Sequence, residues 1–199
     1  GEEEFSHPTF CSTIIAEGNT SKEQIKDAFE RGEKINGNTQ FHFTISEDYF
    51  QEIAKLRAFR ILWKEKTGNE SFIFAEIATK NQQKDNAYNN LISSTTACMS
   101  AIFGSADSIL VNSYNEKKPS SDFSERLARN QQNILRNESF LDKVQDPTAG
   151  AYFMEHLTAE LLKDFDISQN QTETKNTTNW LSAEQIEIPN IFGEQSRGE

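Results

Sequence analysis

The sequence predicts an α/β fold in which about four parallel strands alternate with helices. Short segments rich in β-branched and aromatic residues are each followed by longer segments whose apolar residues recur every three to four positions. Alternation of this kind is typical of parallel strands joined by right-handed crossovers. A sheet of four parallel strands has two unpaired edges, so the pattern also predicts a partner or a missing half.

The first half of the chain contains two of the predicted strands and two helices. Residues 9–15 (TFCSTII) are expected to form a short buried strand, and residues 21–35 a helix capped near Thr20 with Glu23 close behind. Residues 40–45 (QFHFTI) alternate in polarity and predict a second strand. A helix follows Ser46-Glu47-Asp48 and ends at Gly68. Its predicted core-facing stripe consists of Tyr49, Ile53, Leu56, Phe59 and Trp63.

The second half repeats the pattern. Residues 71–78 (SFIFAEIA) predict a third strand, which a polar connector over 79–86 joins to a helix from Tyr88 to Phe103. Residues 107–112 (DSILVN) predict the fourth strand. The remaining helices are expected from about Ser121 or Asp122 to Asn137, and from about Ala151 to Asp164, after a break at Pro147 and Gly150.

The composition changes after residue 165 and predicts two parts. Residues 1–165 contain all the periodic segments and are expected to form the folded domain. Residues 166–199 are rich in Asn, Gln, Thr, Ser and Glu, which predicts a disordered polar tail whose few apolar residues would suit a small docking segment.

The charge and the absent sequence patterns exclude several classes of protein. The net charge of −11 argues against nucleic acid as a partner, because Lys and Arg must neutralise its phosphates. The chain has no apolar run long enough to predict a membrane span, and no signal-peptide pattern. Cys11 and Cys98 lie in apolar contexts, as buried free thiols do in a reducing compartment, and we expect a cytoplasmic protein.

Four short segments, taken in order, resemble the substrate barrel of methylmalonyl-CoA mutase. They are EIAKLRAFRILW (52–63), AYNN (87–90), ARNQQ (128–132) and DPTAGAY (146–152). The resemblance covers over half of the chain and leans toward the small, non-catalytic subunit of the two-chain enzymes. A complete (β/α)8 barrel needs about 250 residues. The resemblance therefore implies a partial TIM-type barrel, equivalent to the C-terminal part of the family's barrel.

The resemblance also implies which cofactor the family uses and which subunit carries it. Enzymes of the family rearrange methylmalonyl-CoA to succinyl-CoA with adenosylcobalamin, which a separate domain binds through an Asp-x-His-x-x-Gly motif. His7, His42 and His156 all lie outside such a motif. We therefore expect this chain to bind no cofactor itself, and a large catalytic subunit to carry the cobalamin.

The family's substrate contacts are expected to be altered in this chain. The position of a histidine that binds the substrate carbonyl is Phe74 here, so no catalytic residue is predicted. A second histidine position is Leu110, and a turn that contacts CoA reads Ile77 to Lys80. The polar residues that match positions facing the substrate and cofactor are Asn112, Gln132 and Glu138.

Several other polar residues have a simpler structural interpretation. Arg126 and Arg129 could bind a phosphate, but ion pairs with Glu125 or Asp122 are the expected alternative. Asn89 and Asn90 are expected to satisfy backbone groups where a loop enters a helix, and Asp146-Pro147 to form the turn before the last helix. His42 is expected to be an ordinary strand residue and His156 a solvated one. The sequence also contains no metal-ligand spacing and no Gly-rich phosphate loop.

Three functional hypotheses follow. The first is a non-catalytic partner of a cobalamin-dependent mutase large subunit. The second is an acyl-CoA-binding isomerase domain with its own site at the carboxyl ends of the strands, where barrel enzymes place their chemistry. The third is a half-barrel that associates with itself through its open sheet edges.

Overall fold

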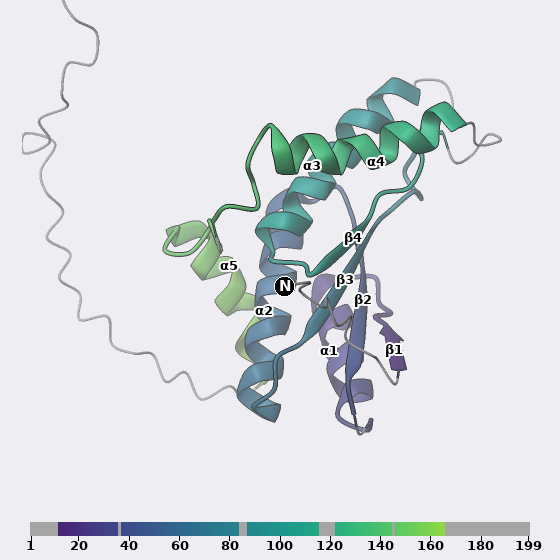
Figure 1. Ribbon diagram of the computed structural model, residues 1–199. Coiled ribbons are helices and arrows are strands. Elements are labelled where there is room, and N and C mark those ends of the chain that lie inside the picture. Colours follow the sequence, from purple (N-terminus) through teal and green to yellow (C-terminus); the bar gives the residue numbers. More distant parts are fainter. Residues whose placement is uncertain (1–11, 36, 84–86, 116–121, 145, 166–199) are drawn as a thin grey trace, which may run out of the picture. The chain divides into compact units, whose positions relative to one another are not determined.

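A computed structural model describes residues 12–35, 37–83, 87–115, 122–144 and 146–165 of the chain. The predicted tail, Cys11 and the first residues of the predicted first strand lie outside the described residues. The described part is an α/β structure built around one sheet (Figure 1).

The sheet has four strands that run parallel in the order β1-β2-β3-β4, as the alternation of elements predicts. The sheet does not close into a barrel. The fourth strand is shorter than its predicted range of 107–112. Just before it, the Asp107 carboxylate accepts a hydrogen bond from the backbone N–H of Ile73 at 2.7 Å. The strands are β1 (Ser12–Ile15), β2 (Thr39–Ile45), β3 (Phe72–Ile77) and β4 (Ser108–Leu110).

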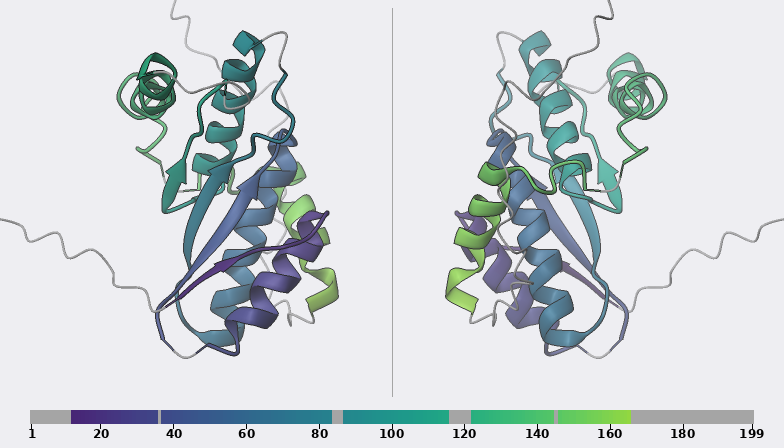
Figure 2. Two further views of the ribbon diagram at one scale, coloured as in Figure 1. Left: turned by 90° about the vertical axis from the view of Figure 1, so that its right-hand side faces the viewer. Right: turned by 90° about the vertical axis from the view of Figure 1, so that its left-hand side faces the viewer.

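Five α-helices of the described part of the chain connect and cover these strands. The longest, α2, lies between the sheet and α5, whereas α4 runs beside α3 at the upper end of the molecule (Figures 1 and 2). The helices are α1 (Ser21–Gly32), α2 (Tyr49–Thr67), α3 (Ala87–Phe103), α4 (Asp122–Asn137) and α5 (Tyr152–Leu162), the last continued by a short 3₁₀ turn, η1 (Lys163–Phe165).

The predicted start of α1 is confirmed, but the helix ends three residues before its predicted end. Thr20 and Glu23 form a capping box, in which the Glu23 backbone N–H donates to the Thr20 hydroxyl at 3.2 Å. At the other end, Gly32 lies against α2. A Cβ atom at this position would come within 2.7 Å of the Trp63 ring and 2.9 Å of the Phe41 ring. The close approach of α1 to the core therefore requires glycine here.

The predicted stripe on α2 is correct, but α2 is buried on its other sides as well. Every residue from 52 to 59 is buried, because the sheet covers one side of the helix and α5 packs on the opposite side. A second covering layer contributed by residues 152–162 cannot be inferred from the local periodicity of α2.

The core lies between the sheet and α2 and is dominated by aromatic rings. Phe41 on β2 is fully buried, and its ring centroid lies 4.6 Å from those of both Phe59 and Trp63. Phe43 contacts Phe59 in the same way at 4.9 Å. Edge-to-face packing at such distances adds about 0.5–1.5 kcal/mol per pair to the burial of the rings.

The opposite face of the sheet is partly exposed along the described strands. Side chains alternate between the two faces of a strand, and residues paired in register share a face. We call this second surface the inner face, because it would line the interior of a closed barrel. It consists of Thr13, Ile15, Gln40, His42, Thr44, Phe72, Phe74, Glu76, Ser108, Leu110 and, just beyond β4, Asn112.

No helix among the described residues is both long and apolar enough to cross a membrane.

Candidate functional site

Three polar side chains meet on the inner face, one each from β2 and β3 and one from just beyond β4. The Nε2 atom of His42 lies 2.9 Å from Oε2 of Glu76. The amide of Asn112 donates to Oε1 of Glu76 at 3.0 Å and to the backbone carbonyl of Ile77 at 3.2 Å. We call this arrangement the polar row. The register of the sheet builds it, because His42 and Glu76 lie two residues apart along adjacent parallel strands.

The contact between His42 and Glu76 is an ion pair only when the imidazole is protonated. Nε2 is buried and has no well-oriented hydrogen bond within the described structure, although the carboxylate oxygen is close. The Glu76 side chain is one-third exposed. The polar row can therefore accept hydrogen bonds from a group that approaches the inner face, and its charge depends on the protonation of His42.

Phe74 and Leu110, the two positions where the sequence analysis expects family histidines, also lie on the inner face. The Phe74 ring packs edge-to-face on His42 with the ring centroids 4.8 Å apart. Leu110 is 42% exposed and pairs in register with Glu76. Apolar groups therefore border the polar row on the strands β3 and β4.

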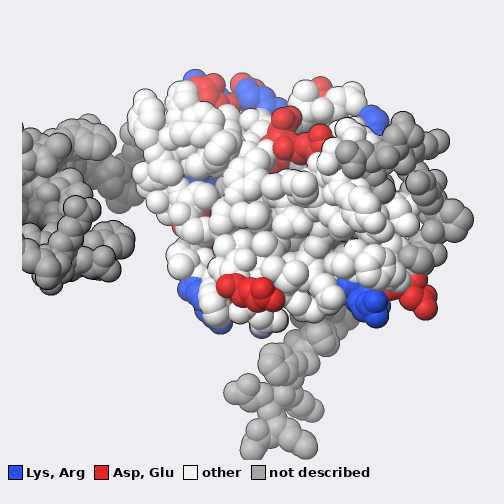
Figure 3. Space-filling view, turned by 90° about the horizontal axis from the view of Figure 1, so that it is seen from above, with Lys and Arg blue, Asp and Glu red and all other residues white. Residues whose placement is uncertain are grey.

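The carboxyl ends of the strands form a narrow cleft beneath the start of α3. Its walls include Ser46, Thr79, Asn90 and Asn112, and the space inside is about 20 Å³. A cavity of this size holds about one water molecule. The described surface at this end is mostly uncharged, and its Lys and Arg side chains are scattered rather than clustered (Figure 3).

Asn90 holds the loops above this cleft together. Its side chain accepts from the backbone N–H of Gln83 at 2.9 Å and donates to the carbonyls of Gln83 and Tyr114 at 3.0 and 2.8 Å. The expectation that Asn90 satisfies backbone groups at the entry to a helix is therefore confirmed. This amide joins the loop after β3 to the loop after β4.

The other two candidate residues lie apart from the polar row. Gln132 lines an open groove of about 540 Å³ between α3, α4 and β4, together with Cys98 and Leu135. Glu138 follows α4, is exposed, and donates its backbone N–H to the Ile134 carbonyl at 2.9 Å. Of the three candidates Asn112, Gln132 and Glu138, Asn112 is thus the one that belongs to the polar row.

Gln131, the residue before Gln132 in the ARNQQ motif, has the structural role that sequence reasoning missed. It is buried, and its amide nitrogen donates to the Leu91 carbonyl at 2.9 Å and to the hydroxyls of Ser94 and Thr95 at 2.8 Å each. This amide fastens α4 to α3. Helical periodicity could have identified it, because Gln131 lies on the same side of α4 as the buried residues Ala128 and Leu135.

Arg126 and the two described histidines also have defined surroundings. The Arg126 guanidinium lies over the Phe123 ring, 5.7 Å from its centroid. His156 is 61% exposed and lies 4.0 Å from Glu160, which agrees with the predicted solvated position. Nε2 of His42 is buried against Glu76, and His156 lies on α5. The described residues also contain no cluster of three or more His, Cys, Asp or Glu that could hold a metal ion.

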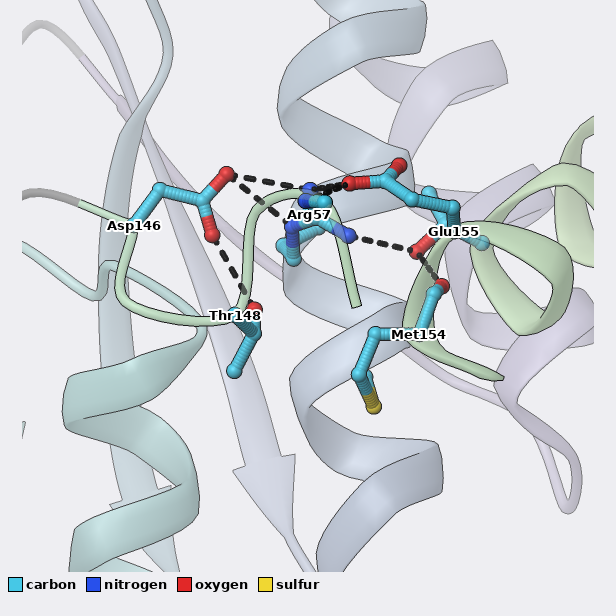
Figure 4. A network of polar contacts seen from close by, with 7 residues as sticks. Arg57, Asp146, Thr148, Met154 and Glu155 are labelled. Atoms are coloured by element: carbon cyan, nitrogen blue, oxygen red, sulfur yellow. Dashed lines mark hydrogen bonds and ion pairs between the residues drawn. The ribbon is translucent and has the colours of Figure 1, made fainter. Parts of the chain in front are cut away.

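A buried arginine anchors the DPTAGAY segment to α2 (Figure 4). Arg57 donates to Asp146 at 3.0 Å, to Glu155 at 2.9 Å and to the Thr158 hydroxyl at 3.2 Å. Burial alone would lower the pKa of Arg57, but the hydrogen bonds with Glu155 and Asp146 raise the pKa above its ordinary value. The turn predicted at Asp146 therefore exists, and its carboxylate binds α2.

A second buried cation on α2, Lys55, connects α1, β2 and α2. Its ammonium group donates to the Gln24 side chain and to the Thr44 carbonyl, both at 2.8 Å, and pairs with the buried Glu52. Burial lowers the pKa of Lys55, although the Glu52 carboxylate opposes this shift. Both cations hold the scaffold together on the covered side of the sheet, away from the inner face.

Comparison with known proteins agrees with this architecture. The sequence profile of the family described as methylmalonyl-CoA mutase matches residues 16–175. The small subunit of methylmalonyl-CoA mutase from Porphyromonas gingivalis is 39% identical over 155 residues, which are 72% of this chain and 25% of that protein. The corresponding small subunit from Streptomyces virginiae is 32% identical over 154 residues, 71% of this chain and 25% of that protein.

The match also includes a protein named methylmalonyl-CoA mutase without a subunit designation. Methylmalonyl-CoA mutase from Rhizobium meliloti is 35% identical over 153 residues, which are 70% of this chain and 22% of that protein. The chain thus spans about a quarter of the length of these relatives. It belongs to the methylmalonyl-CoA mutase family.

Proposed function

We propose that this chain is a non-catalytic, structural part of a methylmalonyl-CoA mutase assembly and acts like a small subunit. The observation that carries the proposal is the packing of Phe74. Its ring lies 4.8 Å from the ring of His42, at the position where the family resemblance expects a histidine that binds the substrate carbonyl. A phenyl ring offers no hydrogen bond to a carbonyl, so this contact of the substrate is lost.

The dimensions and charge of the strand ends support the same proposal. The cleft at the strand ends has space for about one water molecule, so it is smaller than the pockets that usually hold small-molecule ligands. The phosphates of CoA would also need clustered basic residues, and those described at this end are scattered (Figure 3). In this proposal a large subunit carries the adenosylcobalamin, and the assembly functions in the cytoplasm.

The proposal is tested by mixing the chain with a cobalamin-bearing mutase large subunit and separating the mixture by size exclusion. We expect the two chains to elute together, with the absorbance of the bound cobalamin marking the complex. An Arg57→Met variant should associate less well if the DPTAGAY segment contributes to the contact, whereas Arg136→Met on the exposed end of α4 should not differ from the wild type. Separate elution of the two wild-type chains at every ratio would contradict the proposal.

The polar row favours a second candidate, an acyl-CoA-binding domain with its own site. His42 gives the inner face a donor when its imidazole is protonated, and this donor could hold a thioester or carboxylate beside Glu76 and Asn112. Calorimetric titration with methylmalonyl-CoA tests this candidate. Saturable heat that Glu76→Gln weakens, and that Glu160→Gln beside His156 leaves unchanged, would establish it. Absence of heat at millimolar ligand would exclude it.

A further inference from the structure

Both edges of the sheet lack a strand neighbour among the described residues. β1 pairs only with β2, and β4 pairs only with β3. Unpaired edges present backbone N–H and C=O groups that readily pair with a further strand. Since all four strands are parallel and adjacent in chain order, a strand added beside β4 in the same direction would continue the order of a barrel.

The inner face carries little charge, although the chain as a whole has a net charge of −11. Its only ionisable side chains are His42 and Glu76, which lie 2.9 Å apart on the same protomer. The Glu76 carboxylate also accepts the hydrogen bond from Asn112. Two copies could therefore bring their inner faces together without placing unpaired acidic groups opposite each other.

The apolar side chains of the inner face could fill the interior of a closed barrel. Ile15 at one edge and Leu110 at the other are 52% and 42% exposed, and Phe72 and Phe74 are half-buried between them. A barrel of eight parallel strands is filled by layers of such side chains, contributed by alternate strands. The inner face therefore supplies side chains for half of such an interior, and it is partly exposed.

We infer that two copies of this chain associate through a two-fold axis, with β4 of each copy paired to β1 of the other, and close an eight-stranded parallel barrel. A two-fold axis along the barrel axis keeps every strand parallel. It also makes the contact between β4 of one copy and β1 of the other occur twice, as symmetric contacts do in closed dimers. It uses both edges, so no unpaired edge remains. This inference goes beyond the proposed function, because it concerns the chain without a large subunit.

Light scattering coupled to size exclusion tests the inference on the full chain alone. We expect a mass twice the chain mass of 22.7 kDa at high concentration, with dissociation on dilution. Leu110→Lys and Ile15→Lys each place a charge inside the closed barrel and should weaken the dimer at least tenfold. Ile134→Lys, on α4 and 46% exposed, is the matched control and should leave the dimer unchanged. Urea unfolding of each monomer verifies that these variants fold.

Several results would overturn the inference. One is a wild-type mass equal to a single chain at the highest soluble concentration, or association only after a mutase large subunit is added. Another is an open series of larger masses, which would mean that the edges pair without closing. A third is equal weakening by Ile134→Lys and Leu110→Lys, which would place the interface on the helices.

Discussion

The covered face and the inner face of the sheet are built from the same strands but differ in what surrounds them. Phe41, Ile73 and Ala75 on the covered face are fully buried beneath α2, which α5 covers in turn. The alternate residues His42, Phe74 and Glu76 on the inner face remain partly exposed. Substitutions on the covered face should therefore change the stability of the isolated chain, and those on the inner face should chiefly change what it binds.

The largest difference is expected between two phenylalanines on opposite faces. Phe41→Ala should lower the free energy of unfolding by about 3–5 kcal/mol, because it removes a buried ring and leaves a cavity against Phe59 and Trp63. Phe74→Ala should cost less than about half of that, since its ring is half-exposed. Urea unfolding of both variants measures the difference. Equal losses would mean that the inner face is packed in the isolated chain.

The anchoring of α5 should be the next most sensitive feature. Arg57→Met should lower the free energy of unfolding by about 2–3 kcal/mol, somewhat less than for a fully buried pair, because Asp146 and Glu155 are partly exposed and can be hydrated. Amide hydrogen exchange should then become faster throughout α5. The control Arg136→Met removes an exposed pair with Asp142 and should cost under about 0.5 kcal/mol. Unchanged exchange in α5 would show that Arg57 does not hold this helix.

A buried thiol on α3 should make the stability depend on alkaline pH. Burial raises the pKa of Cys98 from 9.0 to about 11. As the pH rises, the thiol therefore loses its proton in the unfolded chain before it does so in the folded chain. The stability that the protonated thiol contributes is fully present below pH 9 and is lost as the pH rises toward 11. The wild type should lose about 2 kcal/mol more than Cys98→Ala over this interval. The lowered pKa of Lys55 makes stability rise with pH, but Lys55 is present in both proteins. Its contribution therefore cancels when the wild type and Cys98→Ala are compared. Parallel pH profiles would contradict this account.

The smallest effect is expected for the polar row itself. Glu76→Gln keeps an acceptor for Asn112 and removes a partly exposed charge, so the free energy of unfolding should change by less than about 1 kcal/mol. Thermal unfolding at neutral pH, with Glu160→Gln as the exposed control, measures this. A larger loss would indicate that the polar row stabilises the isolated fold rather than serving an assembled one.

Much of the fold follows from local patterns. The four strands, the capping box at Thr20 and the αL end of α2 at Gly68 are all expected from the periodicity and the turn residues. The errors arise where distant segments meet. The complete burial of α2 depends on α5, and the need for glycine at position 32 comes from the nearby Trp63 ring.

The candidate site was less predictable than the fold. Asn112 could be proposed from the resemblance, but its partner Glu76 and the neighbouring His42 could not, because the register between β2, β3 and β4 brings them together. The sequence around His42, which lies between Phe41 and Phe43, contains nothing that predicts a carboxylate partner. The placement of Gln132 on the outer groove has a similar cause, since it depends on how α4 packs on α3.

The central claim is that the covered face is complete in the isolated chain and the inner face is left open for assembly. Hydroxyl-radical labelling of side chains, read by mass spectrometry, tests both faces at once. In dilute solution we predict rapid oxidation of Ile15, Phe74 and Leu110 and protection of Phe41 and Phe43, followed by protection of the first three when the chain assembles. Protection of Leu110 in the dilute monomer, or its continued oxidation in an assembled complex, would contradict the claim.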